Sequence, residues 1–157
     1  MRAVLQLVSS ACVSVDGKTV ASIEKGFVVL LGVSKGDDEH KAALLAQKLA
    51  KLRIFPDEDG HLNRSLTDEH VRGDVLLIPN FTLLANCKKS RRPDFFAAAG
   101  GEEAERLFLT FREELRLNFS ESEFMPNIVA GIFGAHMQVT LTNDGPVTLV
   151  LDTDEYQ

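Results

Sequence analysis

Apolar and polar residues alternate along the first part of the chain, as they do in half-buried β-strands. The alternation covers residues 2–8 and 11–15, and an Asp-Gly pair that favours a two-residue hairpin turn leads into KTVASI at 18–23. Residues 26–33 are a continuous run of Val, Leu and Phe between glycines, which predicts a strand buried on both faces. The chain therefore begins with a group of predicted strands.

Two later segments repeat apolar residues at the spacing of an α-helix. The first follows Gly36, with Asp37 as the predicted N-cap, and continues to about Lys51. The second covers residues 100–116, where apolar side chains recur three and four positions apart. Each pattern predicts one helix with a single buried face.

The stretch between the two predicted helices contains two more strands. Residues 53–55 are short and extended, whereas residues 61–68 are predicted to be irregular. Residues 74–85 begin as a buried strand, and Pro79 must end that strand or force a bulge because proline has no N–H for a ladder.

The C-terminal part adds strands around NDGPVT (143–148), a sequence typical of a turn between two apolar runs. Residues 127–143 hold two predicted strands, and a last one follows Pro146. A hairpin turn is one interpretation of NDGPVT, and a rigid loop that reaches into a pocket is the other. The order of elements predicts an α+β domain with a mostly antiparallel, barrel-like sheet and two main helices.

Length and composition indicate an ordinary globular protein with one domain over residues 1–157. Apolar residues make up 45% and charged residues 25% of the chain, and no apolar run approaches the roughly 20 residues of a membrane span. The N-terminal residues alternate like a strand and lack the pattern of an export signal, so we expect a cytoplasmic protein. The net charge of −6 argues against coating nucleic acid through overall charge, but it leaves room for a local basic patch.

Standard catalytic and metal-binding motifs are missing from the sequence. The four histidines have no metal-ligand spacing, and Cys12 and Cys87 are far apart without a CxxC pair. The acidic residues 57–60 lack the pattern of a calcium loop and are predicted to form a solvated turn. We therefore expect no cofactor, no metal and no histidine- or cysteine-based chemistry.

Two strand ends remain as candidate sites, IPNFTLL (78–84) and TNDGPVT (142–148). One interpretation of IPNFTLL is a strand bulge beside a hairpin. The other is a pocket in which the Thr82 hydroxyl and nearby backbone N–H groups face a substrate. Backbone donors of this kind can stabilise a developing oxyanion. The basic segment KKSRRP (88–93) follows, and it is either a solvated loop or a contact for an anionic substrate such as phosphate or an RNA end.

Several segments together resemble the D-aminoacyl-tRNA deacylase family. They are MRAVLQLVSSACVSVDG, LLGVSKGD, LRIFPDEDGHLNRSL, FTL at 81–83, KKSRRPDF and FGAHMQVTLTNDGPVT, in the order and spacing of that family. The resemblance covers nearly the whole chain. It implies a homodimer that hydrolyses the ester between a D-amino acid, or glycine, and the 3′ end of tRNA, which is a chirality-proofreading activity without a metal.

The resemblance also assigns roles to individual residues. Asn80, Phe81 and Thr82 would form the catalytic segment, with Phe81 as pocket wall and Thr82 on the oxyanion side. Gly145 and Pro146 would form a cis peptide that enters the partner subunit's pocket, contacts the substrate's amino group and leaves no room for an L side chain. The implied contacts to tRNA are Lys88, Lys89, Arg91 and Arg92.

Three positions depart from the usual pattern of the family. Leu7 stands where the family has an arginine that holds the Gly-Pro loop, and Pro79-Asn80 stand where it has Ser-Gln. These departures leave alternatives open. One is a deacylase with relaxed chirality that acts on L-alanyl-tRNA, with a trans Gly-Pro bond; the others are a non-catalytic tRNA-binding paralogue and a purely structural dimer module.

Overall fold

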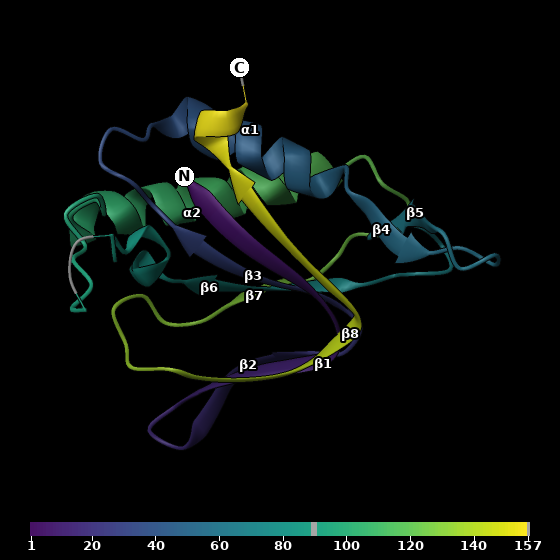
Figure 1. The fold of residues 1–157 in the computed structure, drawn as a ribbon. Coiled ribbons are helices and arrows are strands. Elements are labelled where there is room, and N and C mark those ends of the chain that lie inside the picture. The colour runs from purple at the N-terminus through teal and green to yellow at the C-terminus, as the bar shows by residue number, and fades with distance from the viewer. Residues whose placement is uncertain (89–90, 157) are drawn as a thin grey trace.

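The computed structural model describes residues 1–88 and 91–156, which contain a six-stranded sheet, a two-stranded sheet and two α-helices (Figure 1). The strands are β1 (Arg2–Val15), β2 (Lys18–Ile23), β3 (Gly26–Gly32), β4 (Arg53–Pro56), β5 (Leu62–Ser65), β6 (Asp74–Pro79), β7 (Ile128–Ala130) and β8 (Gln138–Asp152). The helices are α1 (Glu39–Ala50) and α2 (Gly101–Phe119), with short 3-10 turns η1 (Phe81–Leu84) and η2 (Thr153–Glu155).

The long strands β1 and β8 run side by side along most of their length and bend together (Figure 1). The first half of β1 pairs with β3 and its second half pairs with β2, so that β1 belongs to both parts of the sheet. The predicted hairpin is confirmed, since Asp16 and Gly17 both have positive φ between paired Val15 and Lys18. The bend closes the sheet toward a barrel, which confirms the predicted α+β class.

The centre of the sheet is β3, which is buried on both faces as its apolar run predicts. Phe27, Val29 and Leu31 face the helices within the main core, whereas Val28 points into a smaller core on the other side. The remaining order of strands is β3–β6–β7, and both of these pairs are parallel in an otherwise antiparallel sheet.

The two helices pack on each other and on one face of the sheet (Figure 1). The prediction of Asp37 as N-cap of the first helix is wrong, because Asp38 caps α1 by accepting a hydrogen bond from the backbone N–H of Lys41. Within the described residues, no helix is both long and apolar enough to span a membrane.

The prediction of an irregular segment at 61–68 is also wrong, since β5 lies inside it and pairs with β4. The two strands form a small separate sheet at the right of Figure 1. Leu62 and Asn63 are exposed, and so this strand lacks the apolar alternation from which a strand can be recognised.

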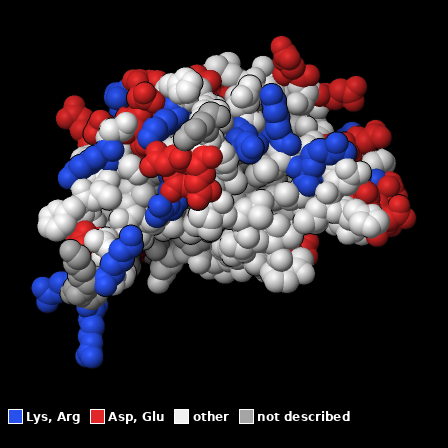
Figure 2. Space-filling view, turned by 45° about the horizontal axis from the view of Figure 1, so that its top comes forward, with Lys and Arg blue, Asp and Glu red and all other residues white. Residues whose placement is uncertain are grey.

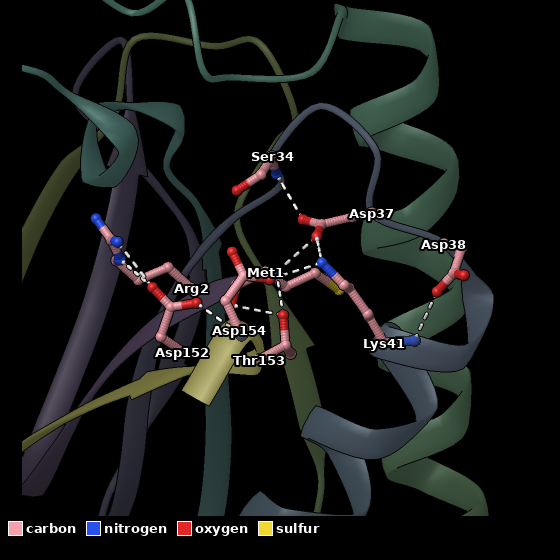
Figure 3. Close-up of polar contacts among 9 residues, drawn as sticks. All are labelled: Met1, Arg2, Ser34, Asp37, Asp38, Lys41, Asp152, Thr153 and Asp154. Atoms are coloured by element: carbon pink, nitrogen blue, oxygen red, sulfur yellow. Dashed lines mark hydrogen bonds and ion pairs between the residues drawn. The ribbon is translucent and has the colours of Figure 1, made fainter. Parts of the chain in front are cut away.

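Asp37 does not cap α1 and lies in the core. There its carboxylate binds the N-terminal ammonium group of Met1 at 2.8 Å (Figure 3). The Asp37 side chain is only 1% exposed, and it also accepts a hydrogen bond from the backbone N–H of Ser34. The ammonium group donates to Thr153 Oγ1 as well, and Thr153 N–H donates to the Met1 carbonyl. The first and last strands are thus joined beside α1 by a buried ionic network.

Candidate active site

The Gly-Pro sequence lies in a bulge of one continuous strand and not in a hairpin turn. Asn143 of β8 pairs with Val8 of β1, and Thr148 of β8 pairs with Gln6, so both arms follow the same partner in the same direction. Residues 144–147 bulge outward opposite Leu7. The hairpin interpretation of NDGPVT is therefore wrong, and the chain forms a short projecting loop.

The Asn143 side chain closes this loop at its base. Its Nδ2 donates to the Leu7 carbonyl at 2.8 Å and to the Val147 carbonyl at 3.0 Å. The peptide bond between Gly145 and Pro146 is cis, as the resemblance implies, and Gly145 has a φ of 113°. A Cβ at Gly145 would lie 2.9 Å from Val147 Cγ2, which leaves no space for a side chain there.

The FTL segment forms the 3-10 turn η1 directly after β6. Pro79 is the last residue of the strand, as predicted, and the bulge considered as an alternative does not form. Asn80 caps the turn, since its Oδ1 accepts hydrogen bonds from both the backbone N–H and the hydroxyl of Thr82. Within residues 1–88 and 91–156, the backbone N–H of Phe81 has no hydrogen-bond acceptor.

Neighbouring strands fix η1 from both of its ends. The Asn80 N–H donates to the Leu31 carbonyl of β3 at 2.8 Å, and Arg2 Nη1 donates to the Leu83 carbonyl at 3.0 Å. Arg2 is itself held by an ion pair with Asp152 at the end of β8. A Cβ on Gly32 would lie 3.0 Å from the Asn80 carbonyl oxygen, so Gly32 lets the turn approach β3 closely.

A pocket of about 400 Å³ opens beside η1, between the ends of β3 and β6, helix α2 and the loop before β8. Its walls include Leu31, Ile78, Phe81, Thr82, Phe133 and Met137. Among the described lining residues, His136 is the one titratable side chain, and it is exposed. The pocket is thus mostly apolar with a few polar groups at Asn80–Thr82, the usual composition of a small-molecule site.

The structure places Asn80, Phe81 and Thr82 side by side at this pocket and places the Gly-Pro loop elsewhere. Gly145 and Pro146 do not line the pocket, and β8 carries them opposite Leu7 of β1. Sequence reasoning missed Asn143, Arg2 and the pocket wall at residues 133–137. The segment FGAHM at 133–137 could have been found from its small residues between two apolar strands.

The basic segment leaves η1 as an exposed loop. Lys88, Arg91 and Arg92 are exposed, and Lys89 lies outside the described residues. Asn86 and Asp94 exchange two backbone hydrogen bonds of 2.9 and 3.1 Å and thereby close the base of the loop. Figure 2 shows Lys and Arg side chains gathered at this corner, at the lower left, on a molecule with many acidic groups elsewhere.

In the acidic turn after β4, one potential metal-ligand atom from each of Asp57, Asp59 and His61 lies within 4.8 Å of the other two. The Asp57 carboxylate accepts hydrogen bonds from the backbone N–H groups of Asp59 and His61. Although burial opposes ionisation, these hydrogen bonds hold the pKa of Asp57 below its usual range. The Asp57 carboxylate thus stabilises the turn predicted at residues 57–60.

Comparison with known proteins decides the family. The model of the family described as D-Tyr-tRNA(Tyr) deacylase matches residues 4–152. The chain belongs to this family. It is 50% identical to a D-aminoacyl-tRNA deacylase of Thermus aquaticus, with 99% of this chain and 97% of the relative covered, and 46% identical to that of Clostridium novyi, with 98% and 97% covered.

Two solved structures share the fold of this chain. A protein described as c-Myc DNA Unwinding Element Binding Protein superimposes with a TM-score of 0.85 at 38% identity, covering 97% of this chain and 98% of that one. A probable eukaryotic D-amino acid tRNA deacylase superimposes with a TM-score of 0.77 at 18% identity, covering 96% and 97%. The second likeness supports the fold alone.

Proposed function

We propose that this deacylase hydrolyses the ester bond of D-aminoacyl-tRNA, and of glycyl-tRNA, in the cytoplasm where aminoacyl-tRNA is used. Family membership over residues 4–152 carries the proposal. The pocket is consistent with it, because apolar walls suit an amino-acid side chain and a nucleoside, and the free Phe81 N–H can bind an ester oxygen.

Catalysis is assigned to the backbone at η1. A water oxygen bonds to the ester carbonyl carbon, and the Phe81 N–H donates to the oxyanion that forms on the carbonyl oxygen. The carbon–oxygen bond to the ribose then breaks, and the ribose oxygen takes up the proton that the water has lost. Asn80 and Thr82 hold the turn through the hydrogen bonds that Thr82 donates to Asn80, which gives the Phe81 N–H a fixed position in a residue that lines the pocket.

Selection against L-amino acids is assigned to Gly145 and Pro146 of a second copy of the chain. The loop does not line the pocket of its own chain, and several residues of β8 are exposed, including Val139 and Val150. A homodimer that covers β8 would bring each loop to the other pocket. The Asn143 side chain fixes the loop to β1. The carbonyl oxygens of Gly145 and Pro146 would therefore have a defined position for the substrate's amino group.

The tRNA itself is the expected partner of Lys88, Lys89, Arg91 and Arg92. The net charge of −6 disfavours binding of nucleic acid through overall charge, and an exposed group of cations near the pocket would direct the acceptor end there. No metal is assigned to the reaction.

Single-turnover deacylation of one tRNA carrying D-tyrosine, L-tyrosine, glycine or L-alanine tests the proposal, with EDTA present throughout. Rapid hydrolysis of the D-tyrosyl and glycyl esters alone is the expected result. Hydrolysis of the L-alanyl ester as well would mean relaxed chirality. If no ester is hydrolysed while tRNA still binds, the chain is a non-catalytic tRNA-binding protein.

A further inference from the structure

Phe96 is an aromatic side chain that the proposed function has not used. It is 80% exposed, more than any other large apolar side chain within residues 1–88 and 91–156. Burying a phenylalanine side chain stabilises a folded protein, and that contribution is forgone here. One exposed apolar residue needs no explanation by itself. Three further observations give this one a role.

First, the backbone that carries Phe96 is held on both sides. Its own N–H donates to Asp94 Oδ1, and Asp94 is paired with Asn86. After it, the Ala97 carbonyl accepts a hydrogen bond from the Lys35 N–H at 2.9 Å, and Ala98 forms a bridge with Ser34 beyond the end of β3. The exposed ring thus stands on a fixed turn.

Second, Phe96 is adjacent to the catalytic turn. The ring of Phe95, the preceding residue, contacts the ring of Phe81 edge to face, with 5.0 Å between their centroids. Phe81 in turn lines the pocket. A molecule that extends out of the pocket past Phe81 therefore meets the surface around Phe95 and Phe96.

Third, Phe96 lies at the end of the basic segment. Arg91 and Arg92 precede it by five and four residues in the sequence, and Lys88 lies with them in the loop that the Asn86–Asp94 bridge closes. An exposed aromatic ring beside exposed cations is the arrangement that binds single-stranded nucleic acid, because bases stack on the ring while phosphates contact the cations.

We propose that Phe96 is a stacking platform for an unpaired base of the tRNA acceptor end, next to the terminal nucleotide that carries the ester. This inference rests on the proposed function. The terminal aminoacyl-adenosine occupies the pocket, the preceding base stacks on Phe96, and phosphates of the acceptor end contact Lys88, Arg91 and Arg92. The platform positions the strand and takes no part in the chemical step.

The test compares two substrates that share the ester and differ in the preceding nucleotides. One is D-tyrosyl-tRNA, and the other is the same amino acid esterified to adenosine alone. F96A is expected to lower kcat/KM on the tRNA by about 5- to 150-fold, the equivalent of one lost base stack. On the adenosine ester its kcat/KM should equal that of the wild type, and F96Y, which keeps the ring, should restore the tRNA reaction.

A binding measurement supports the kinetics independently of turnover. A tRNA with 2-aminopurine at the penultimate position should lose fluorescence on binding the wild type and F96Y, and keep it with F96A. If F96A lowers kcat/KM equally on both substrates, or does not lower it on the tRNA, Phe96 is not a stacking platform. So would dissociation of a dimer by F96A in size-exclusion chromatography. Failure of the wild type on both substrates would instead refute the proposed function.

Discussion

Asn143 donates a hydrogen bond from its side-chain amide to the carbonyl oxygen of Leu7 at 2.8 Å, across the point where β8 leaves its register with β1. The Leu7 side chain is buried in the core, at 3% exposure, and contributes nothing polar to the loop. In this chain the position of the Gly-Pro loop relative to β1 is therefore set by Asn143 and the backbone of residue 7.

Replacing Asn143 by aspartate should release the loop. N143D keeps the shape of the side chain but removes both donated hydrogen bonds and directs a carboxylate at the carbonyls of Leu7 and Val147. We expect a loss of stability of about 1–3 kcal/mol and a fall of at least about 10-fold in D-aminoacyl-tRNA hydrolysis. Thermal unfolding and single-turnover assays measure the two effects.

Thr148 provides the matched control for this variant. Its hydroxyl makes only 3.3 Å contacts with Asn143 and Gln6 at an exposed position. T148V should therefore stay close to the wild type in both assays. If N143D and T148V behave alike, Asn143 does not fix the loop.

A methyl group on Gly145 should damage the loop without unfolding the protein. G145A puts a Cβ 2.9 Å from Val147 Cγ2 on a residue with a φ of 113°, where side chains are strained by about 1–3 kcal/mol. A displacement of about 1 Å in a positioning group costs about 100-fold in rate, so we expect the hydrolysis rate to fall by about that factor.

Gly17 is the control, because its φ of 75° brings similar strain but nothing lies within 4 Å of a Cβ there. G17A should lower Tm and leave activity unchanged; equal loss of activity in both variants would contradict the role of the loop.

Removing the charge of Asp37 should destabilise the fold far more than removing that of Asp154. D37N leaves the ammonium group of Met1 buried without its carboxylate, and uncompensated buried charges cost about 3–5 kcal/mol. Asp154 binds Lys41 from a side chain that is 70% exposed, so D154N should cost at most about 1 kcal/mol. Urea unfolding of the two variants gives the difference, and similar midpoints would show that the buried pair adds no net stability.

Reversing two charges of the basic segment should weaken tRNA binding through electrostatics alone. K88E/R91E should raise KM for D-aminoacyl-tRNA, leave kcat at saturation unchanged and reduce the slope of log Kd against log salt by about one per lost phosphate contact. Lys51, which follows α1 and is also exposed, gives the control variant K51E. A salt slope unchanged from the wild type would remove these cations from the tRNA interface.

Local features of the chain were readable from the sequence because they depend on neighbouring residues. The Asp16-Gly17 hairpin, the doubly buried strand of residues 26–33 and the end of a strand at Pro79 follow from backbone conformation and side-chain polarity alone. The candidate catalytic segment was recognisable for the same reason, since a proline break before FTL forces backbone groups out of the ladder.

What the sequence could not determine depends on partners far away in the chain. NDGPVT resembles a hairpin turn, but β1, more than a hundred residues earlier, pairs with both of its arms and keeps them in one strand. Asp37 resembles a helix cap, but the N-terminal ammonium group reaches it only in the folded chain and draws it into the core. The sequence by itself determined the family, both helices and most of the strands, and it singled out Asn80–Thr82 as the candidate segment. Long-range pairing in the tertiary structure decided that the Gly-Pro loop belongs to one continuous strand and lies outside the pocket of its own chain.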